Sequence, residues 1–148
     1  MNTDLQITKA EHGHLSAIAE IESECFSDPW PEESLEMLVD GRAMGLVALF
    51  GGEVAGYVGM LCVLDEGQII NVAVRSDFRR QGIGAALMDE LERYSRENGI
   101  VYLSLEVRET NTAARALYSA KGYSERGLRK GFYSKPPENA VVMTKELL

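Results

Sequence analysis

Cysteine is scarce in this sequence, which excludes the classes of protein that depend on it. Only Cys25 and Cys62 occur, far apart and without a Cys-x-x-Cys pair, so the sequence predicts neither a disulfide framework nor a redox motif. Isolated cysteines of this kind are typical of small buried side chains in a reducing compartment. We therefore expect a cytoplasmic protein in which both thiols are buried.

Long apolar runs and an excess of positive charge are also missing. No run approaches the roughly 20 residues of a membrane-spanning helix, and the amino terminus lacks the basic and apolar regions of a signal peptide. A net charge of −8 argues against a protein that neutralises nucleic-acid phosphates over a broad face. The same charge suits a positively charged substrate, such as an amine or a basic peptide. We expect neither a membrane nor a nucleic-acid partner.

A metal site is not expected either. His12 and His14 stand two residues apart, but no carboxylate or cysteine completes a ligand set at a suitable spacing. The simpler interpretation is a solvated start of the helix that follows.

The sequence does contain the strand and helix patterns of one domain. Its 148 residues, 45% of them hydrophobic, are enough for one core, and no repeat or linker divides them, so we expect a single domain over residues 1–148. Apolar residues in alternating or continuous runs predict strands, and apolar residues three and four apart predict helices. The expected strands are 6–9, 45–50, 53–64, 67–74, 102–107, 124–129 and 140–146. The expected helices are 14–25, 31–39, 82–98 and one capped by Asn111 that packs through Ala113, Ala116, Leu117 and Ala120. A loop with Phe132, Tyr133, Pro136 and Pro137 is expected before the last strand.

The most informative stretch is a strand that enters a helix through a basic, glycine-rich turn. Asn71-Val72-Ala73-Val74 ends the strand, and Arg79-Arg80-Gln81-Gly82-Ile83-Gly84-Ala85 leads into the helix. The first N–H groups of a helix and its positive end attract an anion, and glycines allow that anion to approach closely. Two arginines add positive charge at the rim. The stretch predicts a cradle for a phosphorylated ligand; the simpler alternative is an ordinary strand-to-helix turn.

The spacing of this turn excludes two common phosphate loops. Leu87 stands where a dinucleotide fingerprint needs its third glycine, and the Gly-Lys-Ser/Thr ending of a nucleotide P-loop does not occur. The remaining pattern, Arg-x-x-Gly-x-Gly after a strand of small apolar residues, resembles the acetyl-CoA pyrophosphate loop of the GNAT acetyltransferases. The order of the predicted elements also resembles the GNAT fold. That fold is α+β in three layers (α/β/α), with a mixed, mostly antiparallel sheet and helices on both faces.

Three further motifs resemble one branch of that family, the bacterial ribosomal-protein-alanine N-acetyltransferases of the RimI type. The first is similar to their substrate loop, the second to their second signature and the third to their carboxy-terminal motif. In order, the motifs are Phe26-x-x-Pro29-Trp30; Leu105-Glu106-Val107-Arg108-x-x-Asn111 with Ala114, Leu117-Tyr118 and Gly122-Tyr123; and Arg129-Lys130-x-Phe132-Tyr133 with Asn139-Ala140. The resemblance covers residues from about 15 to 146. It departs on the substrate side, where Asp28 lengthens the Phe-to-Trp segment and Phe132 and Asn139 replace an expected tyrosine and an expected acidic residue.

The resemblance implies how acetyl-CoA is held. Backbone groups of the cradle would bind the pyrophosphate, and the strand before it would pair with the pantetheine arm as an added strand. A bulge is expected to splay this strand from the one at 102–107 and to leave an N–H near Val74 for the thioester carbonyl. Apart from the resemblance, residues 72–74 are plain core. The residues assigned to acetyl-CoA are Val72, Ala73, Val74, Arg79, Arg80, Gln81, Gly82, Ile83, Gly84, Ala85 and Asn111.

The resemblance also assigns the chemistry. Glu106 is implied as the general base, directly or through a water; its alternative is a solvated carboxylate on a strand. Tyr118 is implied as the acid that protonates the departing thiolate; its alternative is a tyrosine that packs on the sheet. Phe26, Trp30 and Tyr133 would line a peptide groove, although Phe26 and Trp30 also suit a hydrophobic plug under a loop.

Three functions follow from these residues. The first is acetyl transfer from acetyl-CoA directly to the N-terminal α-amine of an alanine on a ribosomal small-subunit protein. The second is transfer to a small amine, against which the aromatic pair Phe26 and Trp30 argues. The third is a non-catalytic acetyl-CoA-binding module, against which Glu106 and Tyr118 argue. Wider peptide specificity and transfer to lysine remain open, and the sequence does not indicate an oligomeric state.

Overall fold

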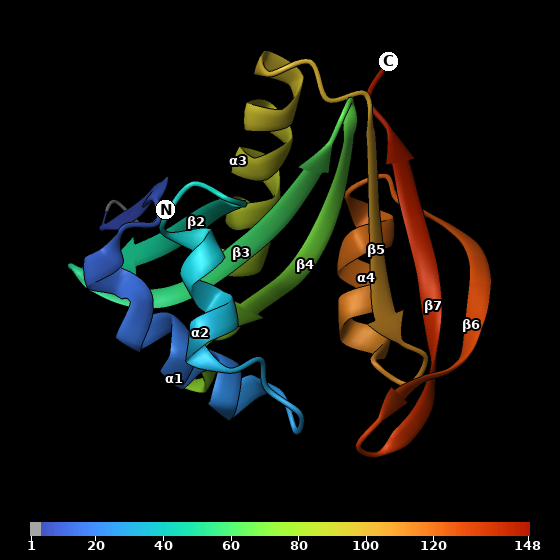
Figure 1. Ribbon diagram of the computed structural model, residues 1–148, viewed down its shortest axis with the longest axis horizontal. Coiled ribbons are helices and arrows are strands. Elements are labelled where there is room, and N and C mark those ends of the chain that lie inside the picture. The colour runs from blue at the N-terminus through green and yellow to red at the C-terminus, as the bar shows by residue number, and fades with distance from the viewer. Residues whose placement is uncertain (1–3) are drawn as a thin grey trace.

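Seven strands form one sheet in the computed structural model, which describes residues 4–148 (Figure 1). Their spatial order is β1-β2-β3-β4-β5-β7-β6, and only β4 and β5 run parallel to each other. A tight hairpin joins β2 to β3, with φ values of +59° at Gly51 and +87° at Gly52, as primed two-residue turns require. The mixed, mostly antiparallel sheet is therefore confirmed. The strands are β1 Leu5–Lys9, β2 Met44–Phe50, β3 Glu53–Val63, β4 Glu66–Val74, β5 Tyr102–Arg108, β6 Ser124–Ser134 and β7 Pro137–Glu146.

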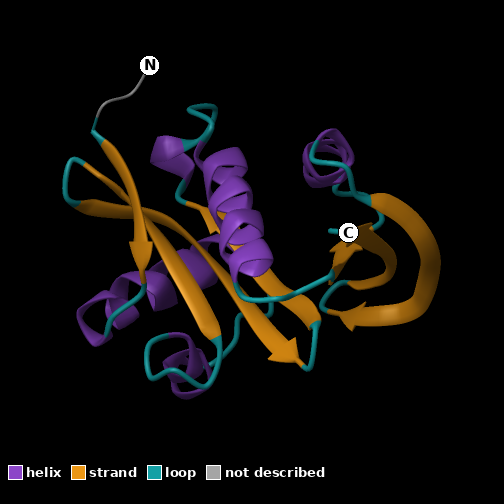
Figure 2. Ribbon diagram, turned by 90° about the horizontal axis from the view of Figure 1, so that it is seen from above, coloured by secondary structure: helices purple, strands orange, loops and turns teal. Residues whose placement is uncertain are grey.

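Helices cover both faces of the sheet (Figure 1, Figure 2). Side chains of α1 and α2 pack on one face around Tyr57, and side chains of α3 and α4 pack on the other around Leu103 and Leu105. The three-layer arrangement is therefore confirmed. The second helix is shorter than expected, because a 3-10 turn replaces its end. The α-helices are α1 Leu15–Cys25, α2 Glu32–Leu35, α3 Ile83–Glu97 and α4 Thr112–Ala120, and the 3-10 turns are His12–His14, Glu36–Leu38 and Ser76–Phe78.

The two parallel strands, β4 and β5, separate after a short stretch of pairing. Residues Glu66, Gly67 and Gln68 of β4 pair with Tyr102, Leu103 and Ser104 of β5, and no pairing continues beyond them. A bulge lies at Ile70, because Ile69 faces Met60 of β3 whereas Asn71 already faces Gly59. A bulge bends the strand that carries it. The expected bulge and splay are present, and Figure 1 shows β4 and β5 diverging from one end.

The last hairpin differs from the expectation. Phe132 and Tyr133 lie inside β6 rather than in a loop, and only residues 135 and 136 separate β6 from β7. The pairing is interrupted, because three residues of β6, 130–132, stand opposite the single residue Asn139 of β7. Gly131, with φ of +66°, donates its N–H to the Asn139 Oδ1 atom at 3.0 Å. A strand interrupted by a bulge loses its period-two pattern, which is why the sequence predicted a loop here.

Two expectations about packing are wrong. In α4, Leu117 packs on the core as expected, but Ala113, Ala116 and Ala120 are exposed, and Ala114 and Tyr118 pack in their place. Alanines lie on both faces of this helix, so periodicity could not distinguish the faces. The cysteines are not both buried: Cys25 is half-buried, and Cys62 is exposed near the end of β3, just before the turn to β4.

Candidate active site

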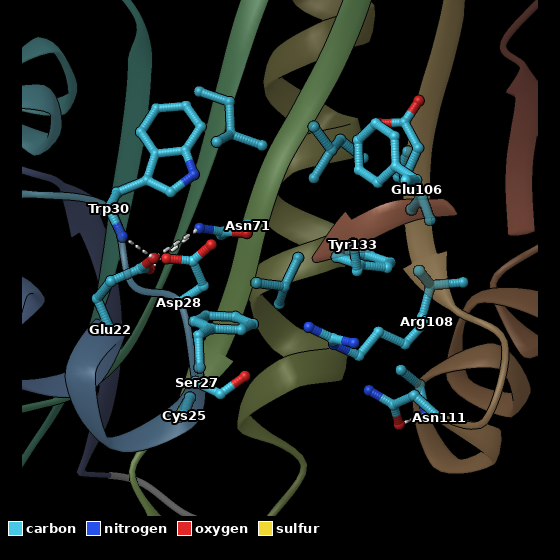
Figure 3. Close-up of a pocket in the computed structure, with 18 of the residues that line it drawn as sticks. Glu22, Cys25, Ser27, Asp28, Trp30, Asn71, Glu106, Arg108, Asn111 and Tyr133 are labelled. Atoms are coloured by element: carbon cyan, nitrogen blue, oxygen red, sulfur yellow. Dashed lines mark hydrogen bonds between the residues drawn. The ribbon is translucent and has the colours of Figure 1, made fainter. Parts of the chain in front are cut away.

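A cavity of about 510 Å³ opens where β4 and β5 separate. Figure 3 shows Glu22, Asp28, Trp30 and Asn71 along one wall, opposite Glu106, Arg108 and Tyr133. These walls come from α1 and the loop after it, β4, β5, α4 and the end of β6. The structure thus brings together residues that are far apart in the sequence. The sequence-predicted residues that line the cavity are Phe26, Trp30, Val72, Glu106, Asn111, Tyr118 and Tyr133.

Glu106 faces the cavity because the side chains of β5 alternate. Leu105 and Val107 are buried in the core, whereas Glu106 between them is partly exposed. The Glu106 Oε2 atom lies 3.8 Å from the Nε atom of Arg129 on β6, whose side chain is mostly exposed. An ion pair this long and this exposed contributes little. The carboxylate is therefore available to accept a proton from a group in the cavity.

Tyr118 reaches the same cavity from α4. Its ring lies 6.1 Å from that of Tyr123, and burial, with a smaller effect of Tyr133, raises the pKa of Tyr118 to about 12. Within residues 4–148 the hydroxyl has no hydrogen-bond partner, yet no polar side-chain atom there is both buried and unpaired. The hydroxyl therefore opens onto the cavity in its neutral form, as a proton donor must.

Tyr133 is held in place by Arg108. The Arg108 guanidinium stacks 4.2 Å from the centre of the Tyr133 ring. The same guanidinium donates to the backbone carbonyls of Lys135 and Pro136, each at 3.0 Å, and to Glu138 at 3.1 Å. Burial raises the pKa of the Tyr133 hydroxyl, and the nearby positive charge of Arg108 partly offsets this. One arginine thus ties the β6–β7 turn to β5 and orients an aromatic side chain of the cavity.

The opposite wall contains a buried carboxylate, Glu22 of α1, with 1% of its surface exposed. The backbone N–H of Trp30 donates to its Oε2 atom at 2.8 Å. The Tyr57 hydroxyl donates to Oε1, and the Asn71 Nδ2 atom lies 3.0 and 3.3 Å from the two oxygens. Glu22 therefore connects α1, the Trp30 loop, β3 and β4 at one point.

Outside the cavity, α3 begins with backbone donors that have no partner within residues 4–148. Gly82 is its N-cap, with φ of +76° and no side-chain cap, and the first helical hydrogen bond runs from Ala86 N–H to Gly82 O at 3.0 Å. The N–H groups of Ile83, Gly84 and Ala85 precede it and are left for a ligand. A Cβ at Gly82 would meet nothing within 4 Å, so the turn that precedes these donors is open on that side. Donors of this kind fit the pyrophosphate of acetyl-CoA.

The strand edge before this turn is only partly as expected. The side chains of Val72 and Val74 pack on the α3 face and that of Ala73 on the α1 face, so only their backbone is available for acetyl-CoA. The Val74 carbonyl accepts from the Cys25 thiol and from Arg79 Nε, each at 3.4 Å. Arg79 is therefore turned toward α1, away from the rim of the cradle. Burial raises the pKa of the Cys25 thiol, which keeps the thiol a donor.

Sequence reasoning assigned no role to Glu22 or Arg108. A signal for Glu22 existed, because it follows Ile18 by one helical turn on the apolar stripe of α1. Arg108 alternates with Glu106 on β5, but its partners belong to a turn about thirty residues further on. No sequence pattern predicts that contact.

The described part of the chain contains no cluster of metal-binding side chains and no helix of membrane-spanning length. Within residues 4–148, no three His, Cys, Asp or Glu side chains are placed to hold a metal ion. No helix over the same residues is both long and apolar enough to cross a membrane.

Known proteins are similar to this chain in sequence and in architecture. Residues 15–123 match the Acetyltransferase (GNAT) family. The ribosomal protein bS18-alanine N-acetyltransferase of Escherichia coli is 34% identical over 145 residues, which cover 97% of this chain and 96% of that relative. The crystal structure of the ribosomal-protein-S18-alanine N-acetyltransferase from Escherichia coli matches with a TM-score of 0.90 at 32% identity, covering 97% of this chain and 94% of that one. Arabidopsis thaliana NAA60 in complex with acetyl-CoA matches with a TM-score of 0.90 at 18% identity, covering 97% and 98%, which is a likeness of fold.

The splayed sheet, the cavity between its halves and the open start of α3 define an acyltransferase that uses a coenzyme A thioester. The chain belongs to the GNAT family, and it is an N-acetyltransferase with acetyl-CoA as its donor.

Proposed function

We propose that this enzyme transfers the acetyl group of acetyl-CoA directly to the α-amine of an N-terminal alanine on a ribosomal small-subunit protein. The observation that carries the proposal is the cavity that Glu106 and Tyr118 line together with the aromatic side chains of Phe26, Trp30 and Tyr133. An aromatic lining of this kind suits the first residues of a peptide. The names of the 34% identical relative and of the 32% identical structure, both alanine N-acetyltransferases of a ribosomal protein, support the same acceptor.

Glu106 and Tyr118 divide the proton transfers in this proposal. The amine nitrogen forms a bond to the acetyl carbon as the carbon–sulfur bond breaks. Glu106 accepts the proton that the amine loses, directly or through a water. An α-amine has a pKa of about 7.7–8.0, so its neutral form is accessible near neutral pH. Tyr118 gives its proton to the departing thiolate, and the proton on Glu106 returns to the phenol through solvent.

Acetyl-CoA is assigned to the cradle and the open edge of β4. The N–H groups at the start of α3 would bind the pyrophosphate, with Arg80 and Gln81 at the rim. The backbone of residues 72–74 would pair with the pantetheine arm, and an N–H near Val74 would polarise the thioester carbonyl. A donor of this kind is worth ~2.7–4 kcal/mol in other enzymes. Asn111, whose Oδ1 atom caps α4 through Ala114 N–H at 3.1 Å, keeps its amide N–H groups for acetyl-CoA.

Mass spectrometry of two basic peptides incubated with enzyme and acetyl-CoA tests the proposal. One peptide begins with a free alanine and lacks lysine, and its twin has a blocked amino terminus and one free lysine. The expected result is one acetyl group on the α-amine of the first peptide and none on the twin. Acetylation of lysine alone would overturn the Nα assignment. Acetyl-CoA binding without acetylation of either peptide would favour a small-amine substrate or a binding module.

The natural partner and the compartment belong to the same proposal. The acceptor is the free amino terminus of a ribosomal protein, and we infer a cytoplasmic enzyme because that is where the acceptor is made. Mixing the enzyme with purified small-subunit proteins tests this, because the acetylated protein is identified by its mass. Modification of none of them would contradict the ribosomal acceptor while leaving the peptide result intact.

A further inference from the structure

Glu22 and Asn71 form a polar pair in the cavity wall to which the reaction described so far gives no role. Glu22 is 1% exposed and forms no ion pair within residues 4–148. A buried carboxylate without a cation is costly unless hydrogen bonds satisfy it. Glu22 is satisfied by Tyr57, Trp30 and Asn71. Because one of these donors, Asn71, is a cavity side chain, the pair points to a role beyond packing.

The pair fixes the orientation of the Asn71 amide. An asparagine amide carries a donor NH2 group on one side and an acceptor oxygen on the other, and its hydrogen bonds decide which side faces which neighbour. A carboxylate accepts hydrogen bonds, so the amide must turn its NH2 group toward Glu22. Nδ2 indeed lies 3.0 Å from Oε1 and 3.3 Å from Oε2 of Glu22. The Asn71 Oδ1 atom is thereby directed away from Glu22, as Figure 3 shows.

The Asn71 Oδ1 atom is an unused acceptor at the cavity. Asn71 lines the cavity, and within residues 4–148 no hydrogen bond to its Oδ1 atom is formed. No polar side-chain atom in that part of the chain is both buried and unpaired, so Oδ1 is accessible. The bulge at Ile70 sets this position: Ile69 packs on the α3 face, whereas Asn71, two residues on, reaches Glu22 on the α1 face.

The position of Asn71 along β4 corresponds to the reacting end of the donor. The cradle follows the carboxyl end of β4, so a pantetheine arm running back along residues 74 to 72 ends beside Asn71. Across the cavity lies Glu106, the proposed base. A neutral primary amine between these residues attacks the acetyl carbon with its lone pair and donates one N–H to Glu106. Its second N–H remains available for another acceptor.

We propose that the Asn71 Oδ1 atom accepts a hydrogen bond from the acceptor amine, and that Glu22 is the positioning residue that holds Asn71 in this orientation. This inference rests on the proposed amine-acetylating function. A neutral amide oxygen orients an amine without favouring its ammonium form, which a carboxylate at the same place would stabilise. Glu22 lies on the far side of the Asn71 amide from the proposed amine, where its oxygens accept from Nδ2 and direct the amide.

Steady-state kinetics of four variants with the alanine peptide test this assignment. Asn71→Ala removes the acceptor, and a lost neutral hydrogen bond predicts a rise in peptide KM of about three- to tenfold. Asn71→Asp places a second carboxylate beside Glu22 and should raise the peptide KM more than Asn71→Ala does. The double variant Glu22→Gln with Asn71→Asp, the swapped variant, restores a donor at position 22 and an acceptor at position 71. Its peptide KM should return most of the way to the wild-type value. Asn98→Ala, which loses a hydrogen bond to Tyr94 O outside the cavity, is the matched control.

Two further readouts separate this role from a structural one. The dissociation constant of acetyl-CoA should stay within about twofold of wild type in Asn71→Ala, because its binding groups are not touched. The swapped variant should need a higher pH for the same kcat/KM, because the carboxylate that it carries at position 71 raises the pKa of the amine. An unchanged peptide KM in Asn71→Ala, or a swap no better than Asn71→Asp, would overturn the proposal.

The wild-type enzyme separates this inference from the proposed function. If the wild type acetylates only the lysine twin, the Nα assignment fails, and the same variants are compared with the twin as acceptor, because its amine is also primary. If neither peptide reacts, methylamine is titrated into the CoA-bound protein while the side-chain amide signal of Asn71 is followed by NMR. A shift of that signal supports the contact, and its absence overturns the assignment.

Discussion

Replacing Arg108 by methionine should weaken the fold and the peptide site together, because one guanidinium supports both. Arg108 is 24% exposed, donates to two turn carbonyls at 3.0 Å and stacks on Tyr133. Methionine keeps the length and apolar character of the side chain but removes every donor. The turn between β6 and β7 then loses its attachment to β5, and Tyr133 loses its support.

The magnitudes follow from these contacts. The two hydrogen bonds to backbone carbonyls, at a net value of about 1 kcal/mol each, give a loss of about 2 kcal/mol in the free energy of unfolding. Glu138, the third acceptor, keeps its hydrogen bonds from Thr110. For a chain of this size, that loss lowers the melting temperature by about 6 °C. The stacking contact is worth about 0.5–1 kcal/mol at a partly exposed site. If Tyr133 must be reordered when peptide binds, this predicts a two- to fivefold rise in peptide KM, by about 1.4 kcal/mol for each factor of ten.

Arg115→Met is the matched control. Arg115 is 29% exposed and donates to Glu125 and to the Glu109 carbonyl, and it does not line the cavity. Thermal unfolding should show a similar loss for both variants, whereas peptide KM should rise only for Arg108→Met. Equal KM values for the two variants, both close to wild type, would refute the positioning of Tyr133 by Arg108.

Three further predictions address the base, the acid and the cradle. Glu106→Gln should lower kcat by on the order of 100-fold without changing acetyl-CoA affinity by calorimetry, and unchanged turnover across neutral pH would remove Glu106 from the mechanism. Burial raises the pKa of Tyr118 from 10.0 to about 12. The contribution of Tyr118 to stability is therefore complete below pH 10 and is lost as the pH rises through 12, at up to about 1.4 kcal/mol per pH unit. In urea unfolding, Tyr118→Phe should lose less stability over this pH range than wild type, and the same dependence of stability on pH in both proteins would contradict this. Gly84→Trp should weaken acetyl-CoA binding, because a side chain at this position extends from the cradle toward Val74 and Leu117, and wild-type affinity in the folded variant would exclude the cradle at this position.

Much of the fold could be predicted because local patterns agree with it. The Gly51-Gly52 turn, the alternation of β5 around Glu106 and the Asn111 cap of α4 each depend on a few neighbouring residues. The predictions were wrong where two patterns fit equally well or where a bulge broke a pattern. The alanines of α4 fit either face, and the bulge of β6 made a strand resemble a loop.

The candidate site was predictable in its parts but not as a whole. Three separate motifs indicated Phe26, Trp30, Glu106, Tyr118 and Tyr133, and the structure places all five around one cavity. Arg79 was expected at the cradle, yet its guanidinium contacts Val74 and Cys25. That contact depends on where α1 lies against β4, which no local pattern specifies.

The sequence by itself determined the order of strands and helices, the glycine turn that opens α3 and the residue types available for proton transfer. These properties depend on backbone preferences and on spacing within about ten residues. Only the tertiary structure decided that Arg108 reaches the last hairpin and that Glu22 meets Asn71 across 49 positions of the chain. Those contacts exist because packing on both faces of one sheet brings distant segments together, and a buried carboxylate must then find its donors there.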